Sequence, residues 1–96
     1  MSPPCNWDKH KATANRRKHG VTFEEAQTVF DNPLAVIFDD QAHSTEESRE
    51  IIIGHSSANR LLLVCFAERD DSIRIISART ATAKERSDYE EGTGFW

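Results

Sequence analysis

The chain has 96 residues, of which 38% are hydrophobic, and a formal net charge of −4 at pH 7. This length fits one compact domain, so residues 1–96 are predicted to form a single unit. No run approaches the roughly 20 apolar residues that a transmembrane helix needs, and the first residues lack the apolar centre of a signal peptide. The sequence therefore predicts a cytoplasmic protein without a membrane span.

The charge is unevenly distributed along the chain. Residues 1–20 carry five Lys or Arg against one Asp, whereas residues 21–50 carry one Arg against eight acidic residues. The overall charge argues against general coating of nucleic acid, but it hides a basic N-terminal end. Cys5 and Cys65 lie in very different surroundings, one near the N-terminus and one inside an apolar run, so a structural disulfide is not expected.

The first predicted helix begins at Asp8, a residue type that caps helix N-termini, and ends at Gly20, which favours the left-handed conformation. Its sequence is mostly polar, with Trp7 and Ala12 as the main packing residues, so we expect it to cover a core poorly.

A second helix is predicted from the capping box that Thr22 and Glu25 can form. Phe23, Ala26 and Phe30 then recur with the spacing of an apolar helical stripe, and the helix is expected to end at residues 32–33.

Four β-rich runs follow, at residues 34–38, 51–55, 61–66 and 73–77. The last three are joined by short polar segments, which predicts an antiparallel meander. Because the run 61–66 is apolar at nearly every position, we expect it to be a central strand covered on both faces.

A closing helix is predicted from Thr82 and Glu85, which can form another capping box, to Gly92. The predicted fold is therefore α+β: two N-terminal helices, an antiparallel sheet of about four strands and a C-terminal helix.

The sequence contains no metal-ligand spacing, phosphate-binding glycine loop or nucleophile elbow, so neither a metal nor a cofactor is expected. RNA cleavage without a metal needs a base for the 2′-hydroxyl, positive charge beside the phosphate and a proton for the leaving oxygen. Residue types that suit these tasks are present and would have to converge in the fold: Lys11, His19, His43, Glu47, Arg49, Arg79, Arg86 and Tyr89.

Each of these residues also has an ordinary structural interpretation. Arg79 and Arg86 could pair with acidic neighbours such as Glu85 on a solvated face, and Tyr89 could be a half-buried packing residue. His43 could be a surface histidine in an acidic loop. The spacing of these residues alone identifies no enzyme.

The ordered motifs nevertheless resemble one known family, the BrnT toxins. The resemblance covers about residues 7–92 and rests on three separated motifs. The first comprises Trp7, Asp8, Lys11, Ala12, Asn15, Lys18, His19 and Gly20, and continues through residues 21–36; the second comprises His43, Ser44, Glu47, Arg49 and Gly54; the third comprises residues 75–79, Ala81, Glu85, Arg86, Tyr89 and Glu90.

This resemblance implies a RelE-like fold and a cofactor-free ribonuclease that stops translation. It implies a BrnA-type antitoxin with a ribbon-helix-helix DNA-binding part, contact with operator DNA only through that antitoxin, and a toxin–antitoxin heterotetramer as one form of the complex. The resemblance also suggests site residues. The catalytic set is His43, Glu47, Arg49, Arg79, Arg86 and Tyr89, with His43 and Glu47 as candidate bases, and the RNA-binding set is Lys11, Lys18 and His19.

Two other classes of function remain open at this point. One is a catalytically inactive binding module that acts only by occupying an antitoxin or a ribosome. The other is a DNA-binding regulatory subunit, which the basic N-terminal end suggests, although no helix-turn-helix or ribbon pattern with base-reading side chains is present.

Overall fold

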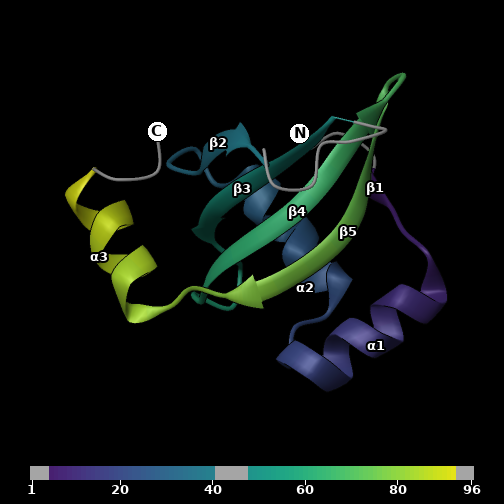
Figure 1. The fold of residues 1–96 in the computed structure, drawn as a ribbon, viewed down its shortest axis with the longest axis horizontal. Helices are drawn as coiled ribbons and strands as arrows, with labels where there is room; N and C mark the ends of the chain where they lie inside the picture. The colour runs from purple at the N-terminus through teal and green to yellow at the C-terminus, as the bar shows by residue number, and fades with distance from the viewer. Residues whose placement is uncertain (1–4, 41–47, 93–96) are drawn as a thin grey trace.

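The computed structural model describes residues 5–40 and 48–92. In chain order the elements are β1 (Cys5–Asn6), α1 (Lys9–His19), α2 (Phe23–Thr28), the short 3-10 helix η1 (Val29–Asp31), β2 (Val36–Asp39), β3 (Arg49–His55), β4 (Leu61–Arg69), β5 (Ser72–Thr80) and α3 (Ala83–Glu91) (Figure 1). The predicted α+β layout is confirmed, with two helices first, then the sheet, then a closing helix.

The five strands form one sheet in the order β1-β5-β4-β3-β2. The pairs β2–β3, β3–β4 and β4–β5 are antiparallel, as predicted, and β4 lies at the centre. The difference from the prediction is β1, which pairs in parallel with β5 through Cys5 and Asn6 only. A strand of two residues is too short to give an alternating pattern, so the sequence offers no signal for it.

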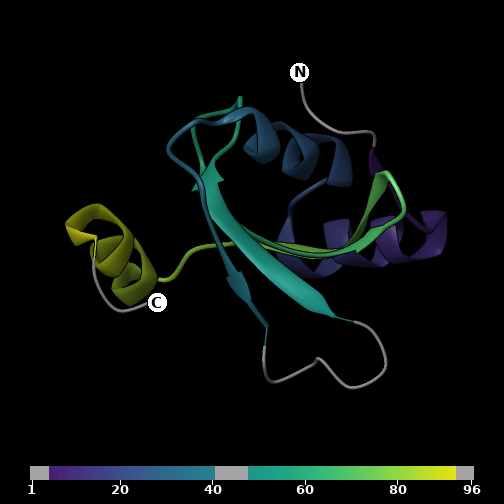
Figure 2. The same cartoon turned by 90° about the horizontal axis from the view of Figure 1, so that it is seen from above.

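Side chains alternate between the two faces of the sheet, and the helices cover these two faces to different extents. One face packs against α1 and α2 and forms the larger core, which includes Phe23, Val64, Phe66 and Ile75. The other, which we call the open face, carries a smaller cluster of Ile53, Leu61 and Leu63 that packs against α3. Figure 2 shows α2 on one side of the strands and α3 beyond one end. Part of the open face therefore has no helix over it among residues 5–40 and 48–92.

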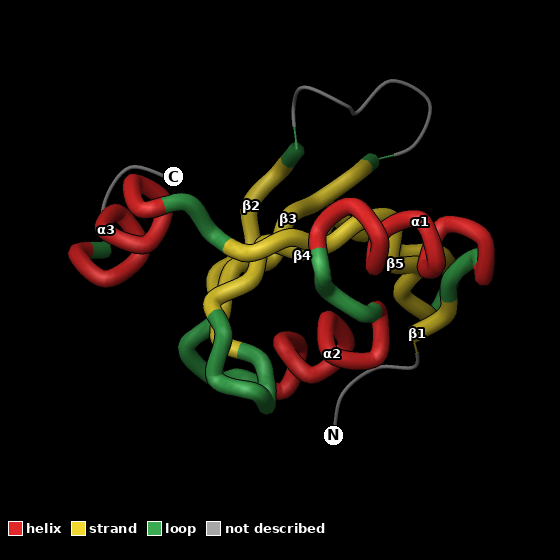
Figure 3. Tube along the Cα trace, turned by 90° about the horizontal axis from the view of Figure 1, so that it is seen from below, coloured by secondary structure: helices red, strands yellow, loops and turns green. Residues whose placement is uncertain are grey.

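Helix α1 is attached to the edge of β5 by a buried asparagine, although its sequence is almost entirely polar. The side-chain amide of Asn15 donates to the carbonyl oxygens of Ala78 (2.8 Å) and Val21 (2.9 Å), and its oxygen accepts from the Ala78 N–H (3.0 Å). The Asn15 side chain thus bonds to the N–H and C=O of Ala78 as a neighbouring strand would. Figure 3 shows α1 beside β5. This bonding compensates for the weak apolar face of the helix.

The predicted helix caps are present, except that the Thr22–Glu25 capping box is only half formed, because the Glu25 carboxylate binds Arg60 and Ser56. The Asp8 side chain accepts from two backbone N–H groups of α1, and Gly20 ends that helix with φ of 69°. Thr22 caps α2, and Thr82 with Glu85 forms the capping box of α3. The start of α2 is also tied to the sheet, because the guanidinium of Arg60 forms an ion pair with the Glu25 carboxylate.

Helix α3 has no fully buried residue and contacts the sheet through few side chains. Tyr89 of α3 and Ala81, just before the helix, pack against the open-face cluster, and the Tyr89 hydroxyl donates to the Leu34 carbonyl oxygen at 2.8 Å. Partial burial raises the pKa of the Tyr89 phenol. The helix therefore covers one end of the open face and leaves the rest accessible.

Candidate active site

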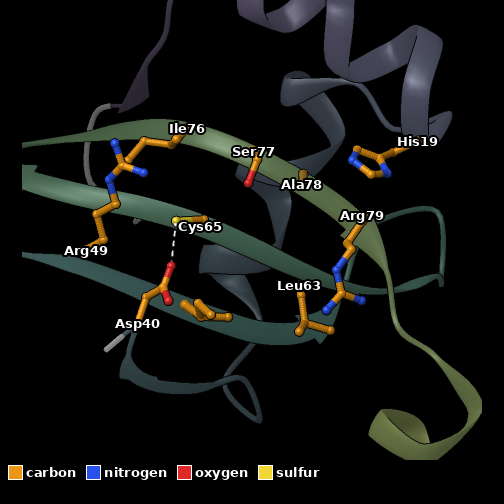
Figure 4. Close-up of a pocket in the computed structure, with 10 residues that line it drawn as sticks. His19, Asp40, Arg49, Leu63, Cys65, Ile76, Ser77, Ala78 and Arg79 are labelled. Carbon is orange, nitrogen blue, oxygen red and sulfur yellow. Dashed lines mark hydrogen bonds between the residues drawn. The ribbon is translucent and has the colours of Figure 1, made fainter. Parts of the chain in front are cut away.

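The uncovered part of the open face contains a pocket of about 350 Å³ (Figure 4). Strand β4 forms its floor through Leu63 and Cys65, β3 contributes Arg49 and Ile51, and the C-terminal half of β5 forms one wall. The complete lining is His19, Asp40, Arg49, Ile51, Leu63, Cys65, Ile76, Ser77, Ala78 and Arg79. The pocket thus combines an apolar floor with charged and polar groups around it.

A β-bulge shapes the wall that β5 provides. Cys65 pairs with Ser77 and the next residue, Phe66, pairs with Ile75, so Ile76 is an extra residue in β5. Such bulges bend a strand and increase its twist. Both Ile76 and Ser77 line the pocket as a result.

Arg49 and Arg79 stand at opposite ends of the pocket, as Figure 4 shows. Arg49 lies across from Ala67 and Arg79 across from Leu63, so the two lie on different sides of β4 and four residues apart along it. Standard strand spacings put their Cα atoms roughly 16 Å apart. Over that span, the two arginine side chains are better placed to bind two neighbouring phosphates than to bind the same phosphate.

Arg79 is held by Glu85 from the first turn of α3. Its Nη1 donates to Glu85 Oε1 at 2.7 Å and its Nη2 to Oε2 at 2.8 Å, a bidentate pair. These hydrogen bonds from Arg79 lower the pKa of Glu85 to about 2, and the same pairing raises the pKa of Arg79. The pair fixes the guanidinium at the pocket and leaves the Nε–H edge of its fork for a ligand.

At the other end of the pocket, Asp40 and Arg49 are neighbours across the edge of β3. The Asp40 N–H donates to the Arg49 carbonyl oxygen at 2.9 Å, and the buried Asp40 carboxylate accepts a contact from the Cys65 thiol at 3.6 Å. This end of the pocket therefore carries both a carboxylate, which lies beside Cys65, and a guanidinium, which extends toward Ile76 (Figure 4).

The structure brings three of the predicted site residues to one pocket, namely Arg49, Arg79 and His19. His19 is the last residue of α1 and lies close to the Arg79 end. Lys11 and Lys18 are exposed on the same helix.

The other predicted residues lie elsewhere or are not described. Arg86 is exposed on α3, and Tyr89 faces Leu34 and the ring of His55, 5.9 Å away between ring centroids. Neither lines the pocket. His43 and Glu47 lie outside the described residues.

Asp40, Cys65 and Ser77 line the pocket but were not predicted from the sequence. Asp40 follows the apolar run 34–38 and Cys65 lies inside the run 61–66, and both runs predict strands. The alternation of side chains along a strand could have placed Cys65 and Leu63 on one face with Arg49. The bulge that brings Ser77 into the pocket has no sequence signal.

Among residues 5–40 and 48–92, no three His, Cys, Asp or Glu side chains gather as a group that could hold a metal ion. Within the same residues, no helix has the length and apolar character needed to cross a membrane.

Comparison with known proteins supports the motif resemblance. The family model described as "Ribonuclease toxin, BrnT, of type II toxin-antitoxin system" matches residues 7–85. The crystal structure of the Brucella abortus ribonuclease toxin BrnT shares this fold, with a TM-score of 0.65, 23% sequence identity, and coverage of 84% of this chain and 99% of that one. Comparison with curated proteins found no match. Because the family model spans most of the chain, this protein belongs to the BrnT family of ribonuclease toxins.

Proposed function

We propose that this chain is an active, metal-independent endoribonuclease that cleaves RNA in the cytoplasm and thereby inhibits translation. In this proposal a BrnA-type antitoxin neutralises it, and the toxin–antitoxin complex represses its own operon. Membership of the BrnT family supports the toxin and ribonuclease parts of the proposal. The observation that carries the proposal is the pocket with Arg79, Arg49 and His19 around its apolar floor.

The reaction needs no group beyond side chains and RNA. The 2′-oxygen of a ribose loses its proton and forms a bond to the adjacent phosphorus, while the bond from phosphorus to the 5′-oxygen breaks. The leaving oxygen takes up a proton, which gives a 2′,3′-cyclic phosphate and a free 5′-hydroxyl. Negative charge builds on the phosphate oxygens in between, where a guanidinium stabilises it best.

We assign this stabilising role to Arg79. Its guanidinium is held in position by the ion pair with Glu85, and its side chain is 41% exposed at the pocket. The same ion pair orients the Nε–H edge of the guanidinium. A donor that is already oriented loses little entropy when it binds the transition state.

Arg49, at the far end of the pocket, would then bind a neighbouring phosphate and set the direction of the strand. His19 supplies an imidazole near Arg79, which can donate a hydrogen bond to RNA. His43 and Glu47 stay as candidate bases, since they are three and two residues away in sequence from Asp40 and Arg49, which both line the pocket. Lys11 and Lys18 on α1 would add positive charge for the RNA backbone.

The proposal is tested by incubating the purified chain with total RNA in the presence of EDTA. Cleavage is expected to continue, to stop when antitoxin is added, and to fall on the order of a hundredfold in Arg79→Ala. Arg17→Ala is a matched control, because it removes an exposed arginine of α1 that does not line the pocket. Circular dichroism of both variants checks that the fold is retained.

Full activity in folded Arg79→Ala would contradict the assignment of Arg79. Absence of cleavage by the unmodified chain, both on free RNA and with translating ribosomes, would instead favour an inactive binding module.

A further inference from the structure

The sheet has a long edge at β2, which is its outermost strand among the described residues. Hydrogen-bonded and non-bonded pairs alternate in antiparallel strands, and the Asp40 N–H donates to Arg49. By that alternation Val36 and Phe38 direct their backbone groups toward β3, whereas Ile37 and Asp39 direct theirs outward. The edge therefore offers two N–H and two C=O groups to another chain.

This edge also carries the two large hydrophobic side chains that are most exposed in the described part of the chain. Ile37, in the middle of β2, is 52% exposed, and Leu34, two residues before the strand, is 75% exposed. Edge strands are ordinarily protected by charges, prolines or bulges that prevent pairing with other chains. An exposed isoleucine on the edge strand is the opposite arrangement and favours pairing with a partner.

The charge beside Ile37 is strongly negative. Asp39 pairs directly with Glu50 across the strands, and like charges in that position repel each other. Burial and the neighbouring carboxylates of Glu68 and Asp39 raise the pKa of Glu50. A cation placed here would relieve this repulsion, so the edge complements a basic segment rather than an acidic one.

We propose that β2 is a docking edge for an extended segment of the antitoxin, which pairs as an additional strand. The segment would place an apolar side chain on Ile37 and, two residues away, a Lys or Arg on Asp39 and Glu50. The apolar and the basic side chain would be two residues apart because side chains on one face of a strand repeat every two residues. The backbone hydrogen bonds would supply much of the affinity. A second copy of this chain fits less well, because two acidic edges would then meet.

This inference rests on the antitoxin part of the proposed function and not on catalysis. Because Asp40 follows β2 directly and lines the pocket, a segment bound along β2 would also pass near the pocket. Pairing at this edge would thus bring the antitoxin to the site that it has to block.

The test measures backbone amide hydrogen exchange of the full chain, alone and in complex with its antitoxin. The Ile37 and Asp39 amides are expected to exchange at least about tenfold more slowly in the complex, because each would gain a partner. The Ile52 amide, already inside the sheet, serves as the internal reference.

A charge reversal provides the second measurement. Asp39→Lys removes the repulsion with Glu50, so it should fold, and it should raise the Kd for the antitoxin by about tenfold or more. Asp71→Lys makes the same change in the exposed β4–β5 turn, two strands away, and is expected to leave the Kd within about twofold. The RNA cleavage rate of Asp39→Lys without antitoxin should equal that of the unmodified chain.

A complex that forms without slower exchange at Ile37 and Asp39 would overturn the docking edge and leave the proposed ribonuclease intact. Concentration-dependent protection of these amides without antitoxin would overturn it in favour of a second copy. If no complex formed at all, the inference would fall together with the antitoxin part of the proposed function, while the cleavage assay would still stand.

Discussion

Glu85 and Arg79 illustrate how one ion pair can serve both the fold and the site. The carboxylate caps α3 through the Thr82 N–H (2.9 Å) and also binds both terminal nitrogens of the Arg79 guanidinium. A side chain that only oriented Arg79 could be replaced without loss of stability. Because Glu85 also caps the helix, its loss affects both the position of Arg79 and the attachment of α3.

Replacement of Glu85 by glutamine is expected to make the free energy of unfolding less sensitive to acid. The folded-state pKa of about 2 lies below the ordinary value of 4.5, so the carboxylate stabilises the fold above about pH 4.5 and loses this effect as the pH falls toward 2. Urea unfolding at pH 6 and near pH 2.5 measures the difference between the two proteins. That difference should shrink at the lower pH; an unchanged difference would show that the carboxylate charge is not what stabilises the pair.

At the level of single residues the sequence predicted part of the lining of the pocket. Arg79, Arg49 and His19 were expected to meet, and they do line one pocket. Arg86 and Tyr89 share the sequence motif with Arg79 but not the pocket, because Tyr89 packs toward Leu34 and Arg86 is exposed on α3. The spacing of a motif shows which residues share a face of a helix. It does not show in which direction the helix leaves the sheet, because that direction depends on tertiary packing.

Among the elements, α1 departs furthest from what its sequence suggests. The helix has almost no apolar face, and it was therefore expected to cover a core poorly. The structure attaches it to the sheet through the three hydrogen bonds of Asn15. Asparagine in a helix is normally read as an exposed or capping residue, and only the position of β5 beside it reveals its role.

Asn15→Ala is expected to destabilise the fold by about 2–4 kcal/mol, because the N–H and C=O of Ala78 would lose their bonds in a buried position. Asn15→Asp should cost at least as much, since it removes both donated bonds and directs a negative charge at two carbonyl oxygens. Thr13→Ala, on the exposed side of the same helix, is the control and should stay within about 0.5 kcal/mol. Chemical denaturation of the three variants measures these values, and a cost for Asn15→Ala no larger than that of the control would contradict the role of Asn15.

At the scale of the whole molecule, α1 and the segment that follows it carry opposite charge. All charged residues of α1 are basic, while the described residues 21–40 contain five acidic residues and no Lys or Arg. A net charge of −4 therefore coexists with a basic helix beside the pocket. RNA would approach from the α1 side, because α1 contacts β5 and the acidic β2 lies at the opposite edge of the sheet.

Single-stranded RNA binding is expected to depend on salt through α1. Replacing Lys11 and Lys18 together with alanine should lower the slope of log K against log salt concentration by about 1.4, or 0.7 for each lost phosphate contact. An oligonucleotide without the 2′-hydroxyl nucleophile avoids cleavage during the titration.

The matched control for this titration is the double replacement of Lys9 and Arg16, which line the groove against α2 on the other flank of α1. It removes the same charge from the same helix. Equal slopes for the two double variants would mean that the RNA senses only the total charge of the helix and not the flank that Lys11 and Lys18 occupy.

The two edges of the sheet differ in a way that limits how many chains can pair with it. At the β5 edge, β1 pairs with Ile73 and Arg74, and Asn15 occupies both backbone groups of Ala78. Only the β2 edge offers a run of outward-facing backbone groups in the described sheet. A sheet with two open edges can add chains without end and grow into fibres. Within the described residues the sheet thus has one edge with such a run, so a strand that paired with β2 would end the sheet after one partner and would not lead to a fibre.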